Sequence, residues 1–261
     1  MREAFSCISQ SVTYFLFEGR LRFSFMASQE LLKEISNAEK YIERHGIDID
    51  AINAFHTYVF WADEEDKDIE TALKISPKAK KLINALVKKQ TDGGDIWWLE
   101  KQIFGKGESY PLLDKWYEIL KLEAHHLFES FCFYMEKNRP PEERFYQPRV
   151  NPLRQVAQLI QDLFDDKLDE GMVFCPGRIG KTQIVKMGNL WFGSNRPERS
   201  NLYSAYSDKI TGGFYDGTNE LITDPTYTYA EIFPKNVEKK PITDGKDLTI
   251  DLIRKKTYPT F

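Results

Sequence analysis

The sequence predicts an α/β protein in which an all-helical N-terminal region precedes part of a domain built on a parallel, helix-covered sheet. Three observations support this fold class. Apolar residues recur at three- and four-residue spacing from Ser28 to about Asn138, as in amphipathic helices. The adjacent Pro140 and Pro141 cannot continue a helix. Beyond residue 170, short apolar runs alternate with helical patterns, which favours parallel strands joined by helices.

The composition is that of an ordinary globular protein. Of the 261 residues, 41% are hydrophobic and 29% are charged, which excludes a disordered or fibrous chain. The net charge of −4 gives no overall attraction to nucleic acid. The cysteines Cys7, Cys132 and Cys175 are odd in number and far apart, so we expect a reducing, cytoplasmic setting rather than disulfides. No apolar run approaches the roughly 18–20 residues of a membrane span, so no membrane partner is expected.

Residues 1–27 are expected to be a leader that is either untranslated or disordered. Their longest apolar stretch, Val12–Phe17, is interrupted by Thr13 and is followed closely by Glu18. A secretion signal needs an unbroken apolar region of about 7–15 residues, so an irregular leader is favoured over a signal. Met26 is an alternative start of translation.

Residues 28–140 are expected to form an all-helical region. In the segment that starts "SPKAKK", Ser76 is predicted as a helix cap and Pro77 as the first helical residue, with Gly93 beyond the helix end. The longest helical pattern covers residues 111–138. No alternation of apolar and polar residues typical of a strand interrupts this region.

Residues 141–261 are expected to form the N-terminal half of the sheet domain. A helix is predicted from about Pro152 to Phe164, and a second one begins near Lys181 after a glycine-bearing turn. The predicted strands are the runs 171–176 (GMVFCP), 201–207 (NLYSAYS) and 248–261, the last as one or two strands.

The stretch "FCPGRIGKTQ", residues 174–183, nearly matches the phosphate-binding loop pattern G-x-x-x-x-G-K-[ST], with Cys175 at the first glycine position. Between a strand and a helix, the backbone N–H groups of such a turn converge on an anion. Gly180 lets the chain approach phosphates, Lys181 would reach the β- and γ-phosphates, and the Thr182 hydroxyl would hold Mg²⁺. ATP and Mg²⁺ are therefore the expected cofactors, and an incidental surface loop is the alternative.

Arg178 places a cation inside this loop. It would contact the γ-phosphate as arginine fingers do, or it would be an exposed, solvated arginine. The loop alone does not decide between these two interpretations. Ile179 is expected to face inward or to act as a spacer in the turn.

Three segments together resemble the large terminase subunit of tailed bacteriophages and prophages: 145–185 (FYQPR to KTQIV), 201–234 (NLYSAYS to EIFP) and 249–261 (TIDLIRKKTYPTF). The similarity extends from about Leu122 to Phe261. In that family the motor domain is a P-loop ATPase with a Walker A loop that bears an arginine and often lacks the first glycine. The resemblance therefore implies that Cys175 is compatible with nucleotide binding.

The resemblance also implies roles for individual residues. Tyr146 would stack on the adenine and Gln147 would hydrogen-bond to its edge, unless both only pack as a linker. Arg178 and Lys181 would be catalytic, and Thr182 would be the metal ligand. The implied nucleotide-binding residues are Gly177, Arg178, Ile179, Gly180, Lys181, Thr182, Gln183, Tyr146 and Gln147. Gly177 departs from the family, whose members often carry a basic residue or a proline there, and residues 203–208 (YSAYSD) resemble its coupling motif.

ATP hydrolysis needs a second motif, an apolar strand that ends in paired acids. The candidate is Asp251, which is followed by Leu252 instead of an acid. In the terminase family this motif and the nuclease domain lie beyond the stretch that resembles our chain. We therefore expect an N-terminal portion of a terminase that does not hydrolyse ATP alone.

The expected function is that of the ATP-driven motor that packages viral DNA into procapsids. The resemblance implies double-stranded DNA, a portal protein and a small terminase subunit as partners, in the bacterial cytoplasm, with oligomers only in the assembled motor. Two alternatives stay open. One is a helicase-like P-loop ATPase of another class, and the other is a non-catalytic prophage remnant or interaction module that binds nucleotide weakly or not at all.

Overall fold

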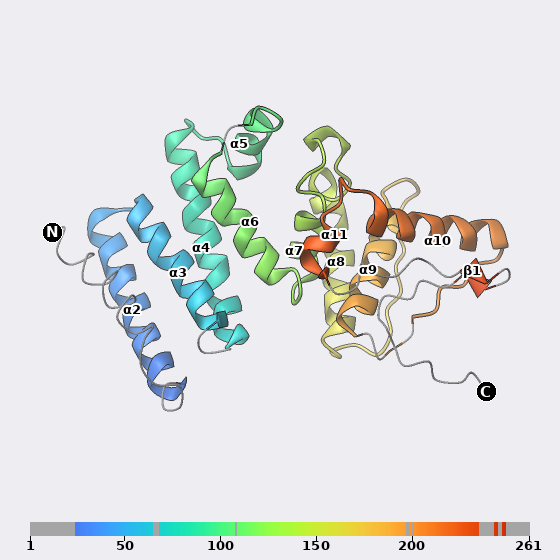
Figure 1. The fold of residues 1–261 in the computed structure, drawn as a ribbon, viewed down its shortest axis with the longest axis horizontal. Helices are drawn as coiled ribbons and strands as arrows, with labels where there is room; N and C mark the ends of the chain where they lie inside the picture. The colour runs from blue at the N-terminus through green and yellow to red at the C-terminus, as the bar shows by residue number, and fades with distance from the viewer. Residues whose placement is uncertain are drawn as a thin grey trace. The chain divides into compact units, whose positions relative to one another are not determined.

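The computed structural model describes residues 24–64, 68–107, 109–196, 199, 201–234, 243–244 and 247–248 (Figure 1). The chain falls into two compact units, divided between Asp95 and Ile96. This division comes earlier in the chain than the boundary expected near Pro140. Helices from both sides of that proline therefore belong to the second unit.

The first unit contains three long helices, α2 (Ser24–His45), α3 (Ile49–Glu64) and α4 (Ile69–Gln90). Helix α3 packs against both α2 and α4. Apolar residues at helical spacing form the faces that meet. The fully buried side chains include Leu31, Ile52, Phe55, Val59 and Ile83.

Helix α4 begins earlier than the sequence predicts. Its N-cap is Asp68, whose carboxylate accepts hydrogen bonds from the backbone N–H of Thr71 (3.0 Å) and from its hydroxyl (2.6 Å). The predicted cap, Ser76, lies inside the helix. Because Pro77 has no N–H to donate to the carbonyl of Leu73, the hydroxyl of Ser76 donates to that carbonyl instead, at 3.4 Å. The proline is thus accommodated within the helix.

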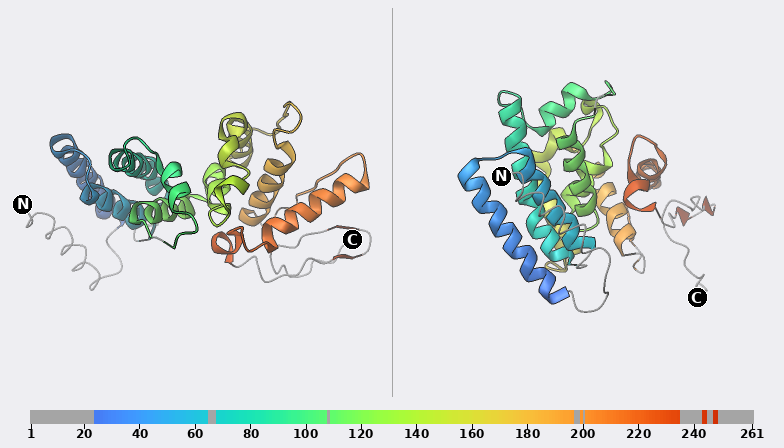
Figure 2. Two further views of the ribbon diagram at one scale, coloured as in Figure 1. Left: turned by 90° about the horizontal axis from the view of Figure 1, so that it is seen from above. Right: turned by 60° about the vertical axis from the view of Figure 1, so that its left-hand side comes forward.

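The second unit contains seven α-helices in its described part: α5 (Ile96–Ile103), α6 (Pro111–Glu123), α7 (Phe128–Met135), α8 (Val150–Phe164), α9 (Lys181–Asn195), α10 (Asp208–Thr223) and α11 (Tyr229–Ile232). Two short 3₁₀ helices, η1 (Pro141–Glu143) and η2 (Gln147–Arg149), lie between α7 and α8. Helix α7 packs against α6, α8 and α9, and α9 also packs against α8 and α10 (Figures 1 and 2). Phe128, Phe131, Leu153, Trp191 and Tyr229 form the core between them.

The predicted parallel sheet is not formed, so the α/β fold class was wrong. Among the described residues, the strands are β1 (Thr243–Asp244) and β2 (Asp247–Leu248), which pair antiparallel. The runs 171–176 and 201–207 contain no residue in a strand. Of the third predicted run, Leu248 lies in β2, and residues 249–261 lie outside the described residues.

The physical reason is that a strand requires a hydrogen-bonded neighbour, which an apolar run cannot specify by itself. No backbone hydrogen bond between the runs 171–176 and 201–207 exists in the described structure. Their large apolar side chains consequently lie in solvent: Phe174 is 86% exposed and Leu202 is 94% exposed. Helix packing, not strand pairing, forms the described core of this unit.

A buried ion pair joins α5 to the segment that follows α7. The side chains of Arg144 and Glu100 are 2% and 4% exposed, and two guanidinium N–H groups donate to the carboxylate at 2.5 and 2.8 Å. The hydroxyl of Tyr117 on α6 donates to the same carboxylate. Burial disfavours the charge on Arg144, but the hydrogen bonds and charges of Glu100 and Tyr117 together outweigh it and raise the arginine pKa. The pair is fully hydrogen-bonded, as a buried charge must be.

We predict that Glu100→Gln lowers the free energy of unfolding by about 3 kcal/mol, because it leaves the Arg144 guanidinium buried without a counter-charge. Chemical denaturation followed by circular dichroism measures the loss. The matched control is Glu70→Gln on α4, which removes an exposed carboxylate paired with Lys74 and should hardly move the denaturation midpoint. Equal shifts for the two variants would contradict a dominant role of the buried pair.

Candidate functional site

The turn that leads into α9 contains two residues in the left-handed conformation. Arg178 has φ 64° and Gly180 has φ 103°. Glycine adopts this conformation freely, whereas a left-handed residue with a side chain costs roughly 1–2 kcal/mol. Left-handed residues in such turns direct successive backbone N–H groups toward one point. A strained arginine in a turn of this kind points to a function for the turn.

A run of backbone donors is available at this turn. In the described structure, the N–H groups of residues 177–183 have no backbone acceptor, and the first helical bond joins the N–H of Ile184 to the carbonyl of Gly180 at 3.1 Å. Four unpaired N–H groups are normal at any helix start, but here the donors extend back through the turn. Together with the positive end of the helix dipole they can bind an anion.

The Lys181 side chain joins the end of the loop to its beginning. Its ammonium donates to the carbonyl of Cys175 and, at 3.0 Å, to the carbonyl of Pro176. These two residues begin the loop and Lys181 begins the helix. A positive charge therefore lies beside the unpaired N–H groups, which adds to the attraction for an anion.

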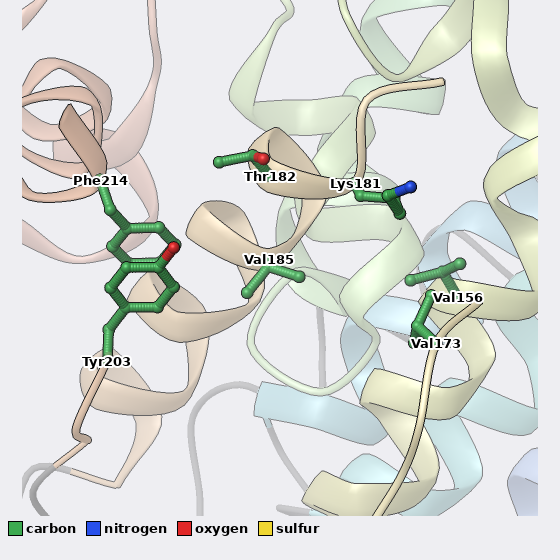
Figure 3. Close-up of a pocket in the computed structure, with 7 residues that line it drawn as sticks. All are labelled: Val156, Val173, Lys181, Thr182, Val185, Tyr203 and Phe214. Atoms are coloured by element: carbon green, nitrogen blue, oxygen red, sulfur yellow. The ribbon is translucent and has the colours of Figure 1, made fainter. Parts of the chain in front are cut away.

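A small pocket lies beside the loop (Figure 3). Its volume is about 210 Å³, and it is lined by Val156, Val173, Lys181, Thr182, Val185, Tyr203 and Phe214. The rings of Tyr203 and Phe214 stack with their centroids 3.6 Å apart. The walls are mainly apolar, and Lys181 and Thr182 supply the polar groups.

The segment FYQPR lies against the same loop, although it is distant in the sequence. The Phe145 ring packs so closely on Gly180 that a Cβ atom at that glycine would lie 2.3 Å from Cε2 of the ring. The guanidinium of Arg149 lies 5.3 Å from the centre of the Phe145 ring and donates to the Phe145 carbonyl at 2.9 Å. A second, open hollow of about 580 Å³ is lined by Glu142, Glu143, Arg144, Phe145, Pro148 and Arg149. The loop thus has an aromatic and cationic neighbour.

The two residues predicted to contact adenine have partners within the protein. Tyr146 is fully buried, its ring lies edge-to-face with Phe133, and its hydroxyl donates to Glu129 at 3.1 Å. Burial raises the pKa of the Tyr146 hydroxyl. Gln147 accepts a hydrogen bond from Arg144 at 3.1 Å. Their roles toward a base stay predictions. Phe145, which the sequence analysis missed, is half-buried and packs against the loop at Gly180.

The other predicted site residues lie around the same turn. Gly177 and Arg178 are exposed, and Ile179 is half-buried. Gln183 lies half-buried in the first turn of α9. A Cβ atom at Gly177 would meet nothing within 4 Å, so the space there does not demand glycine.

Magnesium binding is compatible with the position of Thr182. Its exposed side chain lies in the first turn of α9, next to the loop, where a hydroxyl could join phosphate oxygens and water around the ion. The described residues contain no cluster of three or more histidine, cysteine or acidic side chains that could hold a metal by itself. Any magnesium here would therefore depend on the phosphate groups of a ligand.

Comparison with protein-family models, characterised proteins and solved structures gave no match. In the part of the chain that the structure describes, no helix has the length and apolar character needed to cross a membrane.

Gly180→Ala is predicted to lower the free energy of unfolding by more than about 1 kcal/mol, because alanine is strained at positive φ and its Cβ would collide with the Phe145 ring. The control, Gly213→Ala, changes an exposed glycine inside α10 with open space around it, and should raise stability by about 0.5–1 kcal/mol. Thermal unfolding measures both variants. A Gly180→Ala protein as stable as the parent would contradict the loop geometry.

Proposed function

We propose that the second unit binds a nucleoside triphosphate through the phosphate loop Gly177–Thr182. One observation carries this proposal: at the start of the 15-residue helix α9, the backbone N–H groups of residues 177–183 have no backbone acceptor among the described residues. Helix N-termini with such donors are a common way to bind phosphate. Lys181 adds a charge that can contact phosphate oxygens, and Thr182 adds a hydroxyl for the accompanying Mg²⁺.

The surroundings of the loop favour a nucleotide over a simple anion. Phe145 provides an aromatic ring next to Gly180, and Arg149 provides a planar guanidinium next to that ring; both groups can stack on a base. Arg178 is exposed at the tip of the turn, where its cation can approach the terminal phosphate. A phosphate loop with a stacking surface beside it can hold both ends of ATP.

We further propose that this unit is the nucleotide-binding part of a DNA-packaging motor of the terminase type. The sequence resemblance supports this, and two of its segments, 145–185 and 201–234, line one pocket in the structure. Residues just before FYQPR add further contacts. Arg139 donates to Asp224 at 3.2 Å, and the N–H of Thr228 donates to the carbonyl of Met135 at 3.0 Å. These contacts join the segment 222–234 to the end of α7, from which FYQPR follows.

In this proposal, ATP hydrolysis in the assembled motor drives double-stranded DNA into a procapsid in the bacterial cytoplasm. A portal protein and a small terminase subunit would be the partners, and a nuclease would cut the DNA in the intact protein. A helicase-like ATPase would share nucleotide binding but would lack the nuclease. A non-catalytic prophage module would bind nucleotide weakly or not at all, which separates it from both motors.

Lys181→Ala should weaken binding of a Mg²⁺-bound, non-hydrolysable ATP analogue at least about ten-fold, because a charge-assisted phosphate contact contributes roughly 1.5–3 kcal/mol. Isothermal titration calorimetry gives the affinities. Lys121→Ala, which removes an exposed lysine on α6 of the same unit, is the matched control and should bind like the parent. Equal affinities for the Lys181→Ala variant and the parent would refute the loop assignment.

Arg178→Ala is expected to lower kcat for ATP hydrolysis with much less effect on nucleotide affinity. A cation directed at the transferring phosphoryl group stabilises charge that develops only in the transition state. The assay measures ATP turnover by the motor assembled with double-stranded DNA, alongside calorimetry of the same variant. If Arg178→Ala turns over ATP at the parental rate, the residue is a solvated loop arginine.

A further inference from the structure

The carboxylate of Glu136, at the end of α7, binds the backbone of the segment FYQPR. Its two oxygens accept hydrogen bonds from the N–H groups of Phe145 (2.7 Å) and Tyr146 (2.8 Å). Glu136 is 1% exposed, so these charge-assisted bonds are shielded from water. Two consecutive N–H groups held by one carboxylate fix both the position and the direction of the chain at Phe145.

The ring of Phe145 transmits this constraint to the phosphate loop. It packs against Gly180, with Cε2 and Cζ lying 2.3 and 2.7 Å from where a Cβ atom would be. Gly180 is also the left-handed residue that ends the loop and caps α9. The glycine whose backbone conformation shapes the anion site is therefore in contact with the ring that Glu136 holds in place.

We propose that Glu136 is a positioning residue for the phosphate loop: through the backbone of Phe145 it presses the aromatic ring onto Gly180 and so restricts the loop to the conformation that binds phosphate. The inference rests on the proposed nucleotide function and deepens it. Glu136 itself touches no ligand in this scheme and acts through Phe145.

The carboxylate of Glu136 is surrounded by hydrogen-bond donors and cations. Burial raises the pKa of Glu136, and the N–H groups of Tyr146 and Phe145 and the charges of Arg139 and Arg144 offset this rise in part. The negative charge is therefore compensated by donors and cations from the same stretch of chain. An amide in its place has a single acceptor oxygen and could satisfy only one of the two N–H groups well.

A double-mutant cycle tests the proposal with the parent, Glu136→Gln, Phe145→Ala and the double variant. Hydrogen exchange of the amides of residues 177–183 is measured without ligand, and affinity for the Mg²⁺-bound, non-hydrolysable ATP analogue is measured by calorimetry. Loss of one charge-assisted bond should accelerate exchange and weaken binding about ten-fold in Glu136→Gln. In the Phe145→Ala background the same change should add less than about two-fold, because the two residues act in series.

Glu123→Gln is the matched control, since it neutralises another fully buried carboxylate of the same unit, one that binds Ser130. It should lower the melting temperature while exchange at 177–183 and nucleotide affinity stay parental. Additive effects in the cycle, or a Glu123→Gln variant that changes the loop as much as Glu136→Gln, would overturn the positioning role. If Glu136→Gln does not fold, unchanged loop exchange in Phe145→Ala alone would also overturn it.

The two proposals fail in different ways. If the parent does not bind the ATP analogue, the proposed function is wrong, whereas the exchange cycle still decides whether Glu136 restrains the loop through Phe145. If the parent binds and the cycle is additive, nucleotide binding stands and the positioning role falls.

Discussion

The second unit depends on the buried guanidinium of Arg144. Its N–H groups donate to Glu100 and Gln147 and to the carbonyls of Lys137 and Arg139. An uncompensated charge at this depth would cost several kcal/mol, so all of these acceptors must stay in place together. The chain from residue 137 to 147 is thereby folded tightly around one side chain. Phe145 directly follows Arg144 in the sequence. Because the position of Arg144 is fixed, the Phe145 ring is held where it contacts Gly180.

Helices were predictable from the sequence where apolar periodicity is local. The spacing of apolar residues located the helical region before residue 138 and the start of α9 at Lys181. Helix α4 shows where sequence patterns mislead. The pair Ser76-Pro77 resembles a helix start, but it lies inside the helix, where the Ser76 hydroxyl donates to the carbonyl that Pro77 cannot reach with an N–H. The prediction of a parallel sheet was wrong for a different reason. Pairing partners are a property of the whole fold, and the runs 171–176 and 201–207 contain no information about a neighbour.

The candidate site was predictable from the sequence only where its residues are adjacent in the chain. Residues 177–182 are contiguous, so their spacing alone places glycine, lysine and threonine at one turn. The approach of Phe145 depends on Glu136 and Arg144, whose contacts span separate helices and leave no local pattern. FYQPR offers two adjacent aromatic residues, and burial of Tyr146 rather than Phe145 is decided by packing against Phe133.

The hold of Lys181 on the carbonyls of Cys175 and Pro176 has a kinetic consequence. In the proposed function, a phosphate contact that uses either of these two N–H donors requires the ammonium to release a carbonyl first, so ligand capture then includes a rearrangement within the protein. When that rearrangement is slower than encounter, the observed association rate stops rising with ligand concentration and reaches a plateau. The two loop carbonyls then compete with the phosphate for the Lys181 ammonium. The apparent affinity for the ligand is lowered by the fraction of molecules in which the carbonyls hold that ammonium.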